Sequence, residues 1–155
     1  RIDYGTGVVR LQLSSFWEPY LLALQEKYTV TTLREMLPMK SVYGKRLYEL
    51  LMSYLVNKDD SAYIEFTVDE LKKKLLGDQW DKKYKDFKNF NLKVLKPAMK
   101  DLDHYGNLHV DMTLRRLGRA YKYIYFGVKM KSVERRLESA RNEQEYFEQQ
   151  QTMDL

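Results

Sequence analysis

The chain has 155 residues, of which 44% are hydrophobic, 14% aromatic and 32% charged, a composition typical of one soluble domain of ordinary size with some extra length. It has no cysteine, which excludes disulfides, thiolate nucleophiles and cysteine zinc sites, and no apolar run approaches the roughly 20 residues that a membrane span needs. The net charge is +5, and residues 82–130 hold twelve basic and four acidic side chains, a surplus typical of proteins that bind polyanions.

Residues 1–36 predict a short strand over 8–13 and a helix over 16–28, where Pro19 falls in the first turn. Pro38 marks the end of this region, because the residue before a proline avoids helical geometry. The chain starts at Arg1 rather than Met, so we expect residues 1–36 to be a remnant of an upstream domain. No charged-then-apolar leader opens the chain, which favours a cytoplasmic location without membrane contact.

Residues 42–55 predict a helix that follows the N-cap residue Ser41. Its apolar residues recur at helical spacing and place one stripe toward a core: Tyr43, Leu47, Leu50, Leu51 and Tyr54. Residues 62–66 predict a short strand. A capping box, Thr67 with Glu70, then opens a predicted helix over 68–76 that stops at Gly77.

A long helix is predicted from about residue 87 to 105, with Pro97 inside it. A proline in a helix removes one backbone hydrogen bond and clashes with the preceding turn, so we expect a kink at residues 95–97. The core stripe of this helix is formed by Phe87, Phe90, Val94, Ala98, Leu102 and Tyr105, with Leu95 at its edge.

Residues 108–114 and 120–130 alternate apolar and polar side chains and are joined by the arginine-rich turn "RRLGR" (115–119), a β-hairpin signal in which Gly118 allows the turn. The order of elements predicts an α+β fold: a winged helix-turn-helix over residues 37–130 with a C-terminal β-hairpin wing. Residues 131–155 predict a weakly amphipathic helix that fades into a polar tail.

The face opposite the core stripe of the long helix is basic, and we expect it to enter the major groove of double-stranded DNA. It holds Lys85, Lys88, Asn89, Lys93, Lys96 and Lys100, with Leu92 inside the same arc, where it could touch a thymine methyl group. Within it we expect Lys88, Asn89, Leu92 and Lys93 to face bases. The expected phosphate contacts are Lys85 and Lys96 of this face and, at the wing, Arg115, Arg116, Arg119 and Lys122. Loss of one such contact should flatten the salt dependence of binding.

Other patterns carry less weight. Lysines 72–74 are more typical of a solvated helix face than of phosphate contacts. Tyrosines 121, 123 and 125 are predicted to share one face of the last strand, where packing is favoured over the stacking of single-stranded bases. A metal site within residues 101–111 is disfavoured, because Asp101 and Asp103 point different ways on a helix, whereas His109 and Asp111 fall on the outer face of a strand. We therefore expect no catalytic residues, no metal and no cofactor.

Four segments resemble the C-terminal winged-helix domain of the iteron-binding plasmid replication initiator proteins of bacteria. They are "SVYGKRLYELLMSY", "FTVDELKKKLL", "YKDFKNFNLKVLKPAMKDLD" and "RRLGRAYKYIYF", and they span roughly residues 38–128 in order. Residues 8–33 resemble the closing strand and connecting helix of the preceding winged-helix domain of that family.

The resemblance implies two tandem winged helices, of which the second reads half of each direct repeat at a plasmid origin. It implies opening of the origin with the host initiator and helicase, dimerisation through the upstream domain, and repression of the protein's own gene by dimers. In that family the recognition helix has basic residues at the positions of Asn91, Leu92 and Lys93, and we also expect Asn91 to face bases. Two alternatives stay open: a winged-helix transcriptional regulator, and a winged helix used for protein–protein contact.

Overall fold

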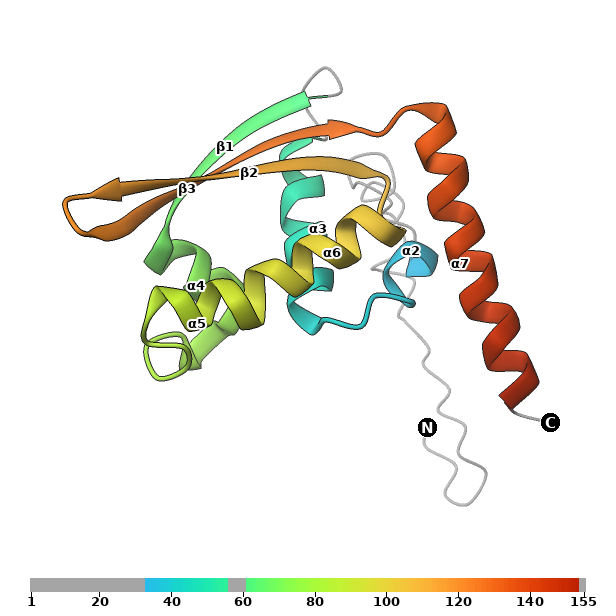
Figure 1. Ribbon diagram of the computed structural model, residues 1–155, viewed down its shortest axis with the longest axis horizontal. Helices are drawn as coiled ribbons and strands as arrows, with labels where there is room; N and C mark the ends of the chain where they lie inside the picture. Colours follow the sequence, from blue (N-terminus) through green and yellow to red (C-terminus); the bar gives the residue numbers. More distant parts are fainter. Residues whose placement is uncertain (1–32, 56–60, 154–155) are drawn as a thin grey trace, which may run out of the picture. The chain divides into compact units, whose positions relative to one another are not determined.

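The computed structural model of the chain describes residues 33–55 and 61–153, and the elements predicted within residues 1–32 lie outside them (Figure 1). In chain order the described elements are α2 (Leu33–Met36), α3 (Val42–Leu55), β1 (Ser61–Thr67), α4 (Val68–Leu76), η2 (Gly77–Gln79), α5 (Phe87–Phe90), η3 (Asn91–Leu95), α6 (Lys96–Tyr105), β2 (Leu108–Leu117), β3 (Ala120–Met130) and α7 (Val133–Met153). This order confirms the predicted α+β winged helix.

The strands of the described residues form one antiparallel sheet in the order β1-β3-β2. Side chains alternate along β1, so that Ala62, Ile64 and Phe66 are buried while Tyr63 and Glu65 are exposed. Figure 1 shows α3, α4, α5 and α6 on one side of the sheet. One face of the sheet therefore packs on the helices to form the core, and the other face is open, as antiparallel sheets allow.

Helix α4 begins and ends as predicted. Thr67 N donates to Glu70 Oε2 over 2.8 Å and Glu70 N donates to Thr67 Oγ1 over 3.2 Å, so both halves of the capping box are present. The helix ends at Leu76, and Gly77 follows with φ of 66°, a conformation that glycine adopts without steric cost.

The buried face of α3 differs from the prediction. Leu47 and Leu51 are buried as expected, but so are Tyr48 and Leu55, whereas Tyr54 is 37% exposed. The reason is Gly44, which does not count as apolar in a sequence pattern but lies against α6. A Cβ on Gly44 would come within 3.3 Å of Asp101, so the missing side chain lets the two helices approach and turns the buried stripe toward Tyr48.

The long predicted helix is interrupted before Pro97, by the π-helical turn η3. In η3 the Lys96 N–H donates to the carbonyl of Asn91, five residues earlier. Such a turn aligns residues five apart, so Phe90 and Leu95 share the core face and both are fully buried. The predicted core stripe is confirmed, and Leu95 moves from its edge into its centre.

The C-terminal segment is more regular than predicted, since α7 continues as a helix to Met153. Its docking centres on Lys131, a buried residue whose Nζ donates to Ser139 Oγ over 2.9 Å and to the carbonyl of Asp103. Burial of the ammonium group lowers the pKa of Lys131. Among the described residues, no helix has the length and apolar character that crossing a membrane requires.

Candidate nucleic-acid interface

The continuous helical segment from α5 to α6, here called the recognition helix (residues 87–105), presents an exposed basic face. Lys88, Lys93 and Lys96 are exposed on it, and Leu92 is 52% exposed between them. Phe90 and Val94, on the opposite side, are fully buried. Because packing fixes the buried side, the free cations and the apolar Leu92 side chain point together away from the core, as the sequence predicted.

Asp86 starts the recognition helix. Its Oδ1 accepts from the backbone N–H of Asn89 over 2.8 Å, and its Oδ2 accepts from Asn89 Nδ2 over 2.5 Å. These hydrogen bonds stabilise the ionised carboxyl and lower the pKa of Asp86. The Asn89 amide, which the sequence assigned to base contact, is thus held at the helix start by one of its two N–H donors, which leaves the second donor and Oδ1 for a base.

Asn91 lies in the π turn and is half-buried. Within the described residues its Oδ1 is enclosed and has no hydrogen-bond partner. Only its amide nitrogen side is left for contact with a base. Of the predicted base-facing residues, Lys88, Leu92 and Lys93 are therefore the ones whose functional atoms are unobstructed.

The wing differs from the predicted turn of residues 115–119. Strand β2 continues to Leu117, which pairs with Ala120, so the loop consists of Gly118 and Arg119 alone. Gly118 has φ of 65°, as tight hairpin turns require. Arg115 and Arg116 consequently lie within the strand, and Arg119 is the arginine at the tip.

Strand alternation places Arg115 and Arg116 on opposite faces of the wing, and a β-bulge in β3 brings Tyr121 to the face of Arg116. Arg115 is paired with Tyr123 and Arg116 with Tyr121, so Lys122 is an extra residue on β3. An extra residue reverses the alternation of a strand, and Tyr121 therefore points toward the helices while Tyr123 does not. The prediction that tyrosines 121, 123 and 125 share one face is wrong for Tyr121.

Arg116 and Tyr121 connect the wing to the recognition helix. The Arg116 guanidinium lies 4.3 Å from the centroid of the Tyr121 ring, and its Nη2 donates to the Tyr121 hydroxyl over 2.8 Å. The Tyr121 ring in turn lies 4.7 Å from the ring of Phe87 in α5. This stack holds the loop end of the wing against the first turn of the recognition helix.

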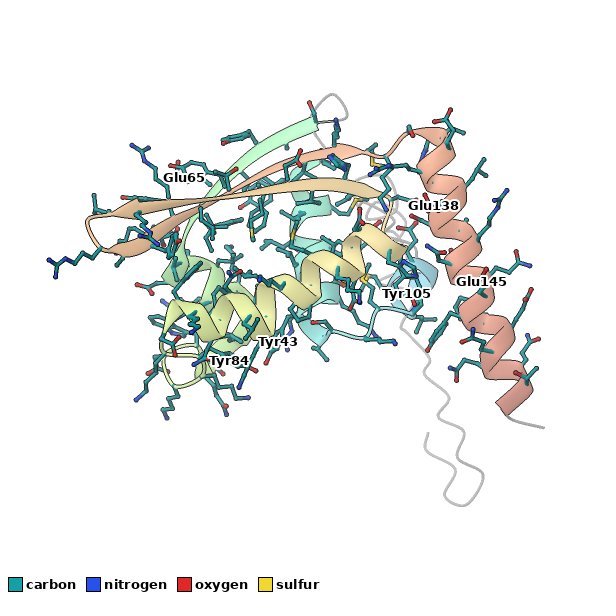
Figure 2. The ribbon with its side chains drawn as sticks, viewed as in Figure 1. Tyr43, Glu65, Tyr84, Tyr105, Glu138 and Glu145 are labelled. Carbon is teal, nitrogen blue, oxygen red and sulfur yellow. The ribbon has the colours of Figure 1, made fainter. Side chains whose placement is uncertain are left out.

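Arg115 lies on the opposite face of the sheet. A hydrogen bond to Tyr125 and the nearby charge of Glu65 raise the pKa of Arg115. Figure 2 shows Glu65 on the side of the sheet away from the helices. The structure therefore separates Arg115 from the other predicted phosphate contacts.

A hollow of about 400 Å³, here called the wing hollow, lies between the wing and the start of the recognition helix. It is lined by Lys85 from the turn before α5 and by Arg119 and Lys122 from the wing, three predicted phosphate contacts from separate parts of the chain. Asp69 of α4 also lines it. The cations meet because the contact of Tyr121 with Phe87 holds the loop end of the wing beside the start of α5.

Lys72 supports this hollow, contrary to the prediction that it is merely solvated. It is only 6% exposed, and its Nζ donates to the carbonyl of Lys85 over 3.1 Å and lies 5.5 Å from the Phe90 ring centroid. Lysines 73 and 74 are exposed as predicted. Three consecutive lysines do not indicate which of them is buried, so the sequence could not identify Lys72 as the buried one.

Comparison with known proteins connects this geometry to a family. The family model described as "Initiator Replication protein, WH1" matches residues 1–52, and the one described as "Initiator Rep protein, WH2" matches residues 67–128. A replication initiation protein from Escherichia coli is 34% identical over 113 residues, or 72% of this chain. The chain belongs to the initiator replication protein family.

The PI protein of Escherichia coli is also similar to this chain, with 31% identity over 105 residues, or 62% of the chain. The chain spans about a third of the length of both relatives, 34% in each case. A crystal structure of the Pi initiator protein in complex with iteron DNA matches it with a TM-score of 0.55 and 26% identity, over 63% of this chain and 42% of that one.

The second family match begins at Thr67 and ends at Val128, so it contains α4, the recognition helix and nearly the whole wing. The first extends through Met52, beyond the boundary we predict near residue 37 and into α3. Helix α3 nevertheless packs on α6, because Ser41 N donates to Asp101 Oδ2 over 2.6 Å and Gly44 lies against the same residue. The boundary near residue 37 stays a prediction.

His109, Asp111 and Asp101 lie as the sequence predicted. His109 and Asp111 lie on the outer face of β2, with Nε2 and Oδ2 3.3 Å apart, while Leu108 between α6 and the sheet is buried. Asp101 is bound to the start of α3. Within residues 33–55 and 61–153, no three histidine or carboxylate side chains gather in a way that could hold a metal ion.

Proposed function

We propose that this chain is the DNA-binding part of a plasmid replication initiator and that it binds double-stranded iteron DNA. The observation that carries the proposal is the meeting of two basic surfaces at the wing hollow, where Lys85 adjoins Arg119 and Lys122. A helix inserted in the major groove has phosphates on both sides, and cations from a wing can contact one of these strands while the helix reads the bases. The similarity to the Pi initiator that was solved with iteron DNA supports the same role.

The proposed contacts fall into two groups. Lys88, Leu92 and Lys93 face the bases, together with Asn89 and Asn91, whose amides have the restrictions described above. The proposed phosphate contacts are Lys85, Lys96, Arg115, Arg116, Arg119 and Lys122. Among these, Arg119 is the strongest candidate, since it is exposed at the tip, whereas Arg116 is stacked on Tyr121 and Arg115 is on the far face.

The proposed role is binding without catalysis, in the bacterial cytoplasm where plasmid DNA is found. By resemblance we also propose the host initiator and helicase as partners of the whole protein, dimerisation through its upstream domain, and repression of its own gene. These roles are supported by family likeness alone.

Selection of bound duplexes from a randomised pool tests the proposal. We expect recovery of one short motif, and tighter binding when that motif is repeated directly in tandem. A single palindromic motif would favour a transcriptional regulator instead. Failure to enrich any sequence, combined with no measurable binding to duplex DNA at low salt, would contradict DNA binding and favour a surface for protein contact.

A further inference from the structure

A second basic hollow lies farther along the recognition helix, and we propose that it binds a phosphate of the DNA strand that the wing does not reach. This inference rests on the proposed function. The hollow, here called the α3 groove, has a volume of about 540 Å³ and lies among the start of α3, the end of α4 and the recognition helix. None of Lys40, Arg46 and Lys83, which line it, belongs to the contacts that the sequence predicted.

The α3 groove has the charge that a phosphate requires. Lys40, Arg46, Lys83 and Lys93 line it, and no acidic side chain of the described residues does so. The wing hollow, by contrast, includes Asp69. Four cations from separate elements around one hollow create a positive potential that a polyanion can neutralise.

Arg46 is already oriented in the groove. Its Nη1 donates to the carbonyl of Leu75, near the end of α4, over 2.5 Å. A guanidinium has five N–H donors, so this bond fixes the group and leaves donors for a phosphate oxygen. A cation that is held in place loses little side-chain entropy when it binds.

The walls of the groove are held in place too. Tyr43 of α3 packs edge-on against Tyr84, with ring centroids 6.3 Å apart, and Figure 2 shows the two side chains together beside the recognition helix. Tyr84 has φ of 52°, the one described non-glycine residue in the left-handed region. Such backbone conformations persist only where the surrounding contacts enforce them, and here the conformation belongs to the turn that carries Lys83.

The start of α3 adds to the same wall. Asp101 of α6 accepts from Ser41 N over 2.6 Å, which fixes this helix end beside Pro97, another residue lining the groove. The Asp101 carboxylate offsets the partial positive charge of this helix start, so the positive charge of the groove comes from its lysines and arginine.

The two hollows match the two sides of a DNA groove. The wing hollow meets the recognition helix at Phe87, whereas the α3 groove meets it at Lys93 and Pro97. At 1.5 Å per residue these points lie about 9–15 Å apart along the helix. The major groove is about 12 Å wide, so a helix lying in it passes from one phosphate strand toward the other. Lys93 borders both the groove and the free face, which makes the basic surface continuous.

The test measures binding of the full chain to its selected duplex and to a scrambled duplex over a series of salt concentrations. We expect Lys40→Ala and Lys83→Ala each to weaken binding to both duplexes by the same factor and to reduce the log–log salt slope by about 0.9, as loss of one phosphate contact does. Lys129→Ala is the matched control: it removes one exposed cation from the outer face of the sheet and should leave the slope unchanged.

A second measurement locates the phosphate. Single phosphates of the selected duplex are replaced by neutral methylphosphonates, and we expect one position at which the replacement weakens binding of the unmodified chain but not of Lys83→Ala. If both lysine variants keep the slope of the Lys129→Ala control and no position shows this coupling, the α3 groove is not a phosphate site, although DNA binding stands. If the unmodified chain binds neither duplex, the proposed function itself fails.

Discussion

Lys72 and Asp86 hold the start of the recognition helix from two sides. Lys72 reaches from α4 to the carbonyl of Lys85, and Asp86 caps the first turn through Asn89. The capping signal of an aspartate before an apolar run can be read in a sequence, but the burial of Lys72 depends on how the turn before α5 folds over α4. The sequence therefore predicts the recognition helix, but it does not predict that Lys72 holds the start of that helix.

Replacing Lys72 tests whether it is structural. We expect Lys72→Ala to lower the free energy of unfolding by about 1–3 kcal/mol, because it removes the part-buried hydrogen bond to the Lys85 carbonyl and the packing of the buried Lys72 side chain on Phe90. Urea unfolding measures the change. Lys82→Ala is the control, since Lys82 is exposed in the turn after α4, and it should stay within about 0.5 kcal/mol of the unmodified chain. Equal effects of the two substitutions would refute the assignment.

The lowered pKa of Asp86 predicts that the stability of the fold depends on pH. Its pKa is lowered in the folded state, so its stabilising effect is present above the unfolded value of about 3.9 and is lost as the pH falls through the folded pKa. We expect Asp86→Ala to lower the melting temperature at pH 7 by about 4 °C, with a smaller difference below pH 4. Asp86→Asn keeps a capping side chain and should melt close to the unmodified chain at pH 7. A difference between Asp86→Ala and the unmodified chain that does not change with pH would contradict this role.

The sequence predicts the wing and the recognition helix, but it does not predict the β-bulge in the wing or the π turn in the helix. Alternation over residues 108–114 and 120–130 predicts the hairpin, yet the same alternation runs uninterrupted through Lys122, where the bulge occurs. Pro97 signals an interrupted helix, yet the interruption is a π turn that ends before it. In both cases tertiary packing chooses between local geometries that the sequence pattern cannot separate.

The stacking of Tyr121 should limit the motion of the wing. Because Tyr121 is stacked between Arg116 and Phe87, we expect Tyr121→Ala to remove about 1 kcal/mol of local stability and to speed amide hydrogen exchange in residues 114–122 about fivefold. Tyr123→Ala is the control, since Tyr123 lies two residues away on the opposite face. Faster exchange in the wing after Tyr123→Ala than after Tyr121→Ala would contradict the assignment of faces.

The molecule as a whole is joined by a polar cluster that the sequence did not reveal. The Tyr48 hydroxyl donates to Glu35 of α2 and accepts from the backbone N–H of Asn107 over 3.2 Å, and Asn107 Nδ2 donates to Glu35 over 2.7 Å. Burial and the bond to Glu35 raise the pKa of Tyr48, which keeps the hydroxyl protonated. The cluster ties α2, α3 and the start of β2 together, although 72 residues separate Glu35 from Asn107.

Tyr48→Phe tests the cluster. We expect it to lower the free energy of unfolding by about 1–3 kcal/mol, since the buried ring stays and only the hydroxyl that serves Glu35 and Asn107 is lost. Denaturant unfolding gives the value. Tyr54→Phe, on the 37% exposed ring of the same helix, should change stability by less than about 0.5 kcal/mol. A cost as large for Tyr54→Phe would show that the hydroxyl of Tyr48 has no special role.

We propose above all that the exposed face of the recognition helix reads base pairs of the iteron. The most direct measurement compares affinities for the selected duplex and for a scrambled duplex at one salt concentration, in the unmodified chain and in Lys88→Ala and Lys93→Ala. We predict that the unmodified chain clearly prefers the selected duplex. Lys88→Ala and Lys93→Ala should each lose about 1–3 kcal/mol of that preference, because each removes a side chain that faces a base. Preference that both variants retain in full would contradict the claim.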